Sequence, residues 1–224
     1  MSRRDRLTTL QKRVLVALAG MEPPWTLTGG AALAGFHLGH RETRDLDLFF
    51  RGHHELSPEM LRQAERRLDD AAFHHERLEL GPAFARYRVD DGGDVVVVDL
   101  VAEPVASVEA PAQVEIDGRE LAIDSAHEIL TNKLNTLISR AELRDLLDAH
   151  ELVAAGGDLG RALEDAARKD RGFSPLVLAE CLATFPVAPL ARRAGLDEAQ
   201  VEAYTRWRTE LAKAVARLAF PEPG

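Results

Sequence analysis

The spacing of apolar residues changes near residue 124 and divides the chain into two halves. Before this point, short apolar segments alternate with turn residues, as in 84–89 and 94–101, which an Asp-Gly-Gly turn joins. Two such segments around a glycine turn predict a β-hairpin. From residue 130 onward, leucines recur at helical spacing instead. We therefore predict an α+β fold, with a mixed α/β core over 1–124 and a helical domain over 125–224.

An Asp-x-Asp pattern lies within one predicted strand of the first half, at residues 45–50. Because side chains alternate along a strand, Asp45 and Asp47 project from one face while Leu46 and Leu48 pack on the other. Two carboxylates on one face repel each other unless a cation lies between them. Oxygen ligands suit Mg²⁺ or Mn²⁺ better than zinc. The pair therefore predicts a metal site.

A glycine pair precedes this strand and opens a predicted helix. Without side chains at Gly29 and Gly30, backbone N–H groups can approach a phosphate closely. Thr28 can add a hydroxyl donor. A strand, a Gly-Gly turn, a helix and then Asp-x-Asp on the next strand together favour a phosphate-handling site.

A third carboxylate, Asp99, interrupts the apolar segment 95–101. An acid within so apolar a strand is costly unless it is paired or coordinated. Phosphoryl transfer with two metal ions needs ligands around both, so Asp99 is a candidate metal ligand or general base. The alternative, that Asp99 pairs with an arginine at the end of the sheet, stays open.

Residues 27–49 closely resemble the first motif of the AbiEii-like nucleotidyltransferase toxins, a family of the polymerase-β-like superfamily. The family pattern has a glycine pair, an arginine, a hydroxyl residue and Asp-x-Asp. It falls on Gly29, Gly30, Arg41, Thr43, Asp45 and Asp47. Serine is usual where Thr43 stands, but threonine keeps the hydroxyl. By this resemblance, Arg41 and Thr43 join the nucleotide-binding residues.

A second stretch, 133–148, resembles the family's later motif of one lysine followed by arginines and aspartates. The matching positions are Lys133, Arg140, Arg144, Asp145 and Asp148. Lys133 and Arg140 share one helical face, so both cations can point toward one anion such as a triphosphate. Asp145 would orient these cations or bind an acceptor. The alternative of exposed salt bridges on an amphipathic helix stays open.

The resemblance implies a nucleotidyltransferase-type mixed sheet with packed helices, followed by a C-terminal helical bundle. It implies transfer of an NMP from an NTP to an acceptor hydroxyl, on RNA such as tRNA or on a protein. Mg²⁺ (or Mn²⁺) would be held by Asp45, Asp47 and Asp99, and catalysis would also involve Lys133 and Asp145. The biological role would be the toxin of a toxin–antitoxin or phage-defence system, with a separate antitoxin protein as partner. A small-molecule (antibiotic-type) nucleotidyltransferase and a non-catalytic binding module of the same fold remain alternatives.

Composition and charge restrict the partners and the cellular location that we expect for this protein. The net charge of −9 argues against non-specific coating of nucleic acid but permits a local basic patch, for which 62–67 and 161–171 are the candidates. No apolar run approaches the ~20 residues of a membrane helix. The N-terminus lacks a secretory pattern, and the single Cys181 can form no internal disulfide. We therefore expect a cytoplasmic protein that does not contact a membrane. The histidines have no zinc-site spacing.

Overall fold

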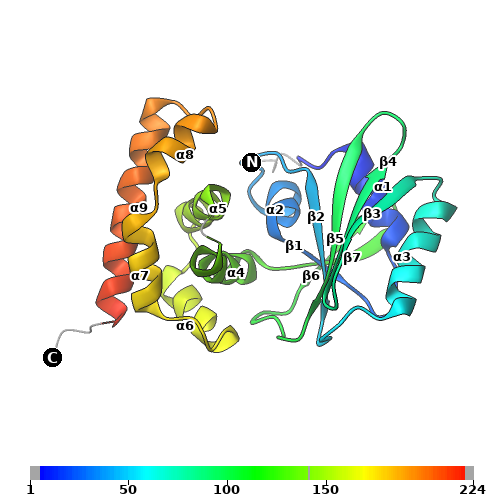
Figure 1. Ribbon diagram of the computed structural model, residues 1–224, viewed down its shortest axis with the longest axis horizontal. Coiled ribbons are helices and arrows are strands. Elements are labelled where there is room, and N and C mark those ends of the chain that lie inside the picture. Colours follow the sequence, from blue (N-terminus) through cyan, green and yellow to red (C-terminus); the bar gives the residue numbers. More distant parts are fainter. Residues whose placement is uncertain (1–5, 141, 220–224) are drawn as a thin grey trace. The chain divides into compact units, whose positions relative to one another are not determined.

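The chain folds into two compact units that divide between Ile129 and Leu130. The computed structural model describes residues 6–140 and 142–219. In Figure 1 the colour of the ribbon follows the sequence, from blue near the N-terminus to red near the C-terminus. The domain boundary near residue 124 stays a prediction.

A seven-stranded mixed sheet forms the centre of the first unit, in the order β3-β4-β5-β2-β1-β7-β6. Its strands are β1 (Thr26–Thr28), β2 (Asp45–Arg51), β3 (His74–Leu80), β4 (Phe84–Asp90), β5 (Val95–Glu103), β6 (Ala112–Ile116) and β7 (Arg119–Ile123). Strand β2 runs parallel to β5 and antiparallel to β1, while β1 runs parallel to β7. The predicted hairpin around the Asp-Gly-Gly turn is confirmed as β4 and β5.

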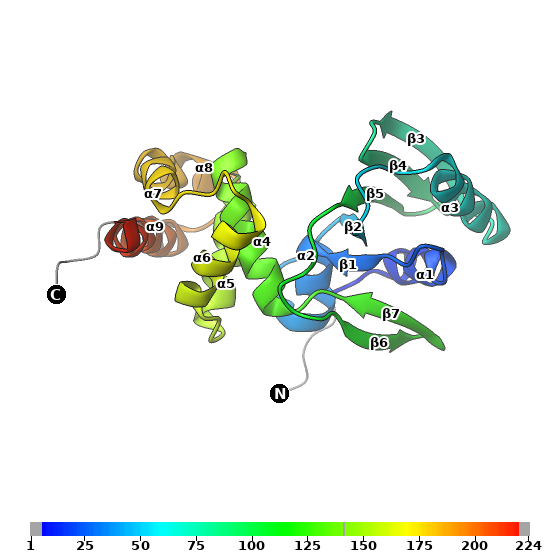
Figure 2. The same ribbon diagram turned by 90° about the horizontal axis from the view of Figure 1, so that it is seen from below.

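Two helices cover one face of this sheet, α1 (Thr9–Leu18) and α3 (Pro58–Asp70), as Figure 2 shows. Both begin at hydroxyl side chains that accept a hydrogen bond from the first turn, Thr8 for α1 and Ser57 for α3. Apolar residues of β2 alternate with polar ones, and Leu46, Leu48 and Phe50 have no exposed surface. Burying each such side chain contributes about 1.5–3 kcal/mol, and this fixes which face Asp45 and Asp47 occupy.

The small-residue segment after the glycine pair is less regular than the predicted helix. It forms a short α2 (Gly29–Ala32) followed by a π-helical turn, η1 (Leu33–His37). The N–H groups of Leu38 and Gly39 both donate to the Leu33 carbonyl, which ends the helix. A Cβ at Gly35 would lie 2.7 Å from Leu7 Cγ, so this glycine lets the segment before α1 pack closely.

The second unit is helical. It contains the part of α4 (Ala126–Ser139) from Leu130 onward, followed by α5 (Leu143–Ala154), α6 (Leu159–Lys169), α7 (Pro175–Thr184), α8 (Val187–Arg193) and α9 (Glu198–Ala219). Both α7 and α8 pack against α9. Within 6–140 and 142–219 no single helix is long and apolar enough to cross a membrane. Helices α7 and α8 together have the required length and apolarity, but the pair is bent by 60°.

Candidate active site

Asp45 and Asp47 lie at the start of β2, on the sheet face opposite to the buried leucines. Both are half-buried. The strand register places Asp47 beside Thr28 of β1 on one side and beside Asp99 of β5 on the other. The three predicted carboxylates therefore lie on one face of two neighbouring strands.

The glycine pair and the Asp-x-Asp strand are in direct contact. Gly29 has a φ of +63°, which favours glycine. A Cβ at this position would lie 3.1 Å from Asp47 Cγ and closer still to Oδ2. A Cβ at Gly30 would lie 2.9 Å from the Arg41 guanidinium and 3.1 Å from the Thr43 hydroxyl. Gly29 is thus required by its backbone conformation and by the Asp47 carboxylate, while Gly30 lets the ends of the Arg41 and Thr43 side chains lie close to the backbone.

Helix α1 positions the loop that leads into β2. The buried Gln11 side chain donates through Nε2 to the Thr43 carbonyl at 3.0 Å, while its Oε1 accepts from Thr8 N at 2.8 Å. The Thr43 hydroxyl in turn accepts from Asp45 N at 3.5 Å. The start of β2 is therefore anchored to the first helix by one buried amide, which the sequence did not reveal.

The donors on this face fit a hard divalent cation. The two carboxylates supply oxygen ligands, which Mg²⁺ prefers. The glycine backbone beside them carries no side chain of its own. Asp45 and Asp47 would hold the ion. Among the described residues, no group of three or more His, Cys, Asp or Glu side chains is arranged around one metal position.

Asp99 is buried and paired with an arginine, the alternative that the sequence left open. Arg86 of β4 donates through Nε to Oδ1 at 2.8 Å and through NH2 to Oδ2 at 2.7 Å. The hydrogen bond to Asp99 raises the pKa of Arg86 further above its usual value. Counting outward from the Asp-Gly-Gly turn places residue 86 opposite residue 99, so the hairpin register contained the signal for this pair.

A second buried cluster adjoins Thr28. Asp124 and Glu128 are fully buried, and Arg51 NH2 lies 2.7 Å from Asp124 Oδ2 and 3.3 Å from Glu128 Oε1. The Thr28 hydroxyl also hydrogen-bonds to Asp124. Burial raises the pKa of Asp124, and the Arg51 charge opposes that rise. Thr28 therefore braces the end of β1, in addition to its predicted role toward phosphate.

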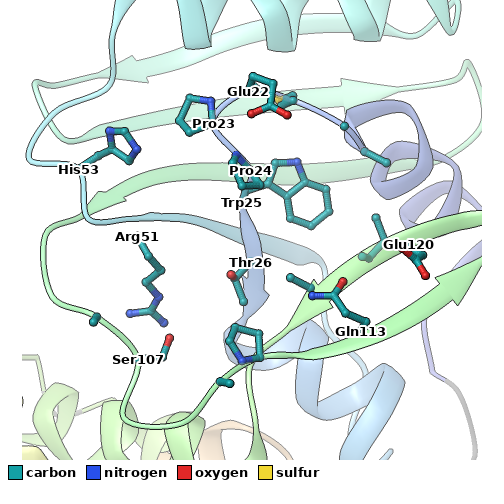
Figure 3. A pocket seen from close by; sticks show the side chains of 18 of the residues that line it. Glu22, Pro23, Pro24, Trp25, Thr26, Arg51, His53, Ser107, Gln113 and Glu120 are labelled. Atoms are coloured by element: carbon teal, nitrogen blue, oxygen red, sulfur yellow. The ribbon is translucent and has the colours of Figure 1, made fainter.

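A cavity of about 760 Å³ lies near the opposite end of β2 from the two aspartates. Figure 3 shows its walls. They come from the segment before β1, from the 106–111 loop and from β6 and β7, and include Glu22, Trp25, Thr26, Arg51, His53, Ser107, Gln113 and Glu120. It shares no residue with the predicted site, since β1 contributes Thr26 rather than Thr28.

The second predicted motif folds into one buried ion cluster in the helical unit. Lys133 Nζ of α4 lies 2.7 Å from Asp145 Oδ1 and 2.8 Å from Asp148 Oδ2 of α5. Arg140 donates to both oxygens of Asp145, at 2.9 and 3.1 Å. Both aspartates are fully buried, so these contacts are not surface salt bridges. Arg144 differs, since it pairs with Glu142 at an exposed position.

Asp145 stays ionised in this cluster. Burial by itself would raise the pKa of Asp145, but the hydrogen bonds from Arg140 and the charge of Lys133 outweigh it and lower the pKa below its usual value. In this cluster, two fully buried carboxylates therefore hold the Lys133 ammonium in a fixed place.

A family pattern that extends over most of the chain identifies it as a nucleotidyltransferase. The chain belongs to the nucleotidyl transferase AbiEii toxin family of type IV toxin–antitoxin systems, whose pattern matches residues 13–222. No curated protein sequence matches the chain.

Solved structures that share the fold include the following two. MenT4, a nucleotidyltransferase toxin from Mycobacterium tuberculosis, has a TM-score of 0.61 at 18% identity, over 94% of this chain and 85% of that chain. JHP933 from Helicobacter pylori has a TM-score of 0.51 at 19% identity, over 94% and 90%. At these identities the likeness concerns the fold alone. The predicted family and the predicted fold class are confirmed.

Proposed function

We propose that this protein transfers an NMP from an NTP to an acceptor hydroxyl, with a divalent cation held by Asp45 and Asp47. The contact between Gly29 and Asp47 carries the proposal, because it brings a carboxylate of the metal strand against the backbone of a glycine turn. In the reaction, the acceptor oxygen attacks the α-phosphorus, the bond from that phosphorus to the bridging oxygen breaks, and pyrophosphate leaves.

Residues of the first unit would bind and orient the nucleotide. The backbone at Gly29 and Gly30 can approach the phosphates closely, and Arg41, packed on Gly30, adds a positive charge there. Thr43 holds the start of β2, which keeps both aspartates in position. Mg²⁺ or Mn²⁺, when bound, would lower the pKa of the attacking hydroxyl and neutralise charge in the transition state.

We assign Lys133 to phosphate binding, as the resemblance of its motif implies. An ammonium group has three N–H donors, and Asp145 and Asp148 accept from two directions. The two carboxylates would therefore orient Lys133 and leave its third N–H donor for a phosphate oxygen. Arg140 would hold Asp145 and contribute a second positive charge.

The acceptor would be RNA, such as tRNA, or a protein, and the biological role that of a toxin countered by a separate antitoxin. Membership of a toxin family supports this role. The net charge of −9 requires that any RNA contact be local, for which the basic segments at 62–67 and 161–171 are the candidates.

An Mg²⁺-dependent labelling assay tests the proposal. Purified protein is incubated with each α-³²P-labelled NTP in turn, together with total RNA and cell extract, beside an Asp45→Asn/Asp47→Asn variant. Label transferred by the wild type alone establishes the reaction and identifies the nucleotide. Gel mobility then shows whether RNA or protein is the acceptor.

Two other outcomes separate the alternatives. No transfer together with no NTP binding by titration would favour a non-catalytic binding module. Binding without transfer to RNA or protein would favour a small-molecule acceptor. Toxicity on expression without the antitoxin supports the toxin role, and harmless overexpression contradicts it.

A further inference from the structure

Four side chains form one row across four neighbouring strands, on the face that carries the metal site. The strand register pairs Arg86 of β4 with Asp99 of β5, Asp99 with Asp47 of β2, and Asp47 with Thr28 of β1. Adjacent strands lie about 4.8 Å apart, so Arg86 is separated from Asp47 by Asp99 alone. Any ion held between Asp47 and Asp99 therefore meets the arginine that already binds Asp99.

The Arg86–Asp99 pair uses both oxygens of the carboxylate. Two parallel N–H···O bonds, at 2.8 and 2.7 Å, join the guanidinium fork to Oδ1 and Oδ2. A divalent cation needs at least one of the same oxygens as a ligand. A cation at Asp99 and the guanidinium of Arg86 would therefore compete for the negative charge of the same two oxygens.

The two partners differ in their freedom to separate. Asp99 is only 6% exposed and needs a positive partner, because a buried carboxylate without one is costly. The Arg86 side chain is 41% exposed, and its guanidinium lies 5.2 Å from the centre of the Phe84 ring. Arg86 can therefore leave Asp99 while its charge stays in water and over an aromatic ring, whereas Asp99 must receive another cation.

We propose that Arg86 is the exchangeable counter-ion of Asp99. It neutralises Asp99 when no metal is bound, and it gives up that carboxylate when a divalent cation binds between Asp47 and Asp99. Arg86 thereby sets the affinity for the cation. This inference rests on the proposed function, since it takes Asp45 and Asp47 as the primary metal ligands.

Binding of Mn²⁺ alone, measured by the loss of the free-ion EPR signal, tests this proposal without reference to activity. Arg86→Gln removes the competing cation and is expected to tighten Mn²⁺ binding about fivefold, the scale of a partly exposed ion pair. Arg86→Lys keeps the charge without the fork and should fall between the wild type and Arg86→Gln. In an Asp99→Asn background, Arg86→Gln should have no effect, because the shared ligand is gone.

Arg88→Gln is the matched control. Arg88 lies two residues along β4 on the same face, is 39% exposed and pairs with Asp90 instead of Asp99. The Arg88→Gln substitution removes the same charge as Arg86→Gln and should leave the Mn²⁺ affinity close to that of the wild type. Equal affinities for Arg86→Gln and Arg88→Gln, or weaker binding by Arg86→Gln, would overturn the proposal.

The same Mn²⁺ measurements distinguish an error in the proposed function from an error in the role of Arg86. If Asp45→Asn/Asp47→Asn binds Mn²⁺ as the wild type does, the metal site itself is misplaced. If that double variant loses binding while Arg86→Gln matches Arg88→Gln, only the role of Arg86 is wrong. If neither the wild type nor any variant binds Mn²⁺, both proposals fail.

Discussion

The carboxylate of Asp47 lies against the backbone of Gly29, with no room for a methyl group between them. Gly29→Ala would place a Cβ in the left-handed region, at a cost of about 1 kcal/mol, and would also displace the carboxylate. We expect a protein that still folds but transfers label at least about a hundredfold more slowly, since small displacements of reacting groups have effects of this size.

Gly118→Ala separates the two effects of that substitution. Gly118 also has a positive φ, +75°, but a Cβ there would meet nothing within 4 Å. It should lose a similar free energy of unfolding in urea and keep full transfer activity. Equal activity losses in the two variants would mean that backbone strain, rather than the position of Asp47, limits the reaction.

Asp145 is expected to stabilise the helical unit strongly. Asp145→Asn leaves Lys133 and Arg140 without a shared, fully buried anion, so we expect a loss of about 3–5 kcal/mol in the free energy of unfolding at pH 7. Glu142→Gln breaks the exposed pair with Arg144 and should cost less than about 1 kcal/mol. Urea titrations of both variants measure the difference, and similar costs would contradict the burial argument.

Asp145 also makes the free energy of unfolding depend on pH in the acid range. The pKa of Asp145 is lower in the folded state than in the unfolded state. Its contribution is therefore complete above the unfolded value of about 3.9 and is lost as the pH falls through the folded value. The wild type should lose stability below about pH 4 more steeply than Asp145→Asn does. Parallel pH profiles would show that other carboxylates control the acid transition.

Local patterns were sufficient to predict much of this architecture. The two-residue alternation of β2 placed Asp45 and Asp47 together, and the Asp-Gly-Gly turn predicted the β4–β5 pair. Both follow from short-range rules, because side-chain direction and turn geometry are set within a few residues. The assignment to the nucleotidyltransferase family came from the resemblance of two motifs.

Interactions between distant positions were not predicted. The Arg51–Asp124 pair joins residues 73 apart in sequence, and Gln11 contacts the loop before β2 across 32 positions. No periodicity marks such partners, since each depends on the register and packing of whole elements. The Asp99–Arg86 pair differs from these, because counting outward from the predicted hairpin turn already places Arg86 opposite Asp99.

Arg51 is expected to hold two buried carboxylates in the folded state. Arg51→Gln would leave Asp124 and Glu128 fully buried without their cation, which should cost about 3–5 kcal/mol at pH 7. Arg62→Gln, which breaks an exposed contact to Glu59, is the matched control and should leave the urea midpoint unchanged.

The stability lost in Arg51→Gln should decrease as the pH falls, whereas the stability contributed by Asp145 is itself lost at low pH. Burial already raises the pKa of Asp124 in the wild type, and loss of Arg51 raises it further. A carboxyl whose folded pKa lies above its unfolded value destabilises the fold when ionised and ceases to do so as the pH falls through the folded value. The deficit of Arg51→Gln relative to wild type should therefore shrink from pH 7 to about pH 5. A constant deficit would mean that lost packing, rather than uncompensated charge, destabilises the variant.

The proposed metal ligands should behave unlike either buried cluster. Asp45 and Asp47 are half-buried, and two carboxylates on one face of a strand repel each other. Asp47→Asn should therefore leave the free energy of unfolding within about 1 kcal/mol of the wild type. Loss of a ligand to the catalytic cation is worth several kcal/mol in the transition state, so transfer should fall about a thousandfold or more. Urea unfolding and label transfer on one preparation measure both quantities. A variant that loses stability and activity together would place Asp47 among the structural carboxylates, with Asp145, instead of in the metal site.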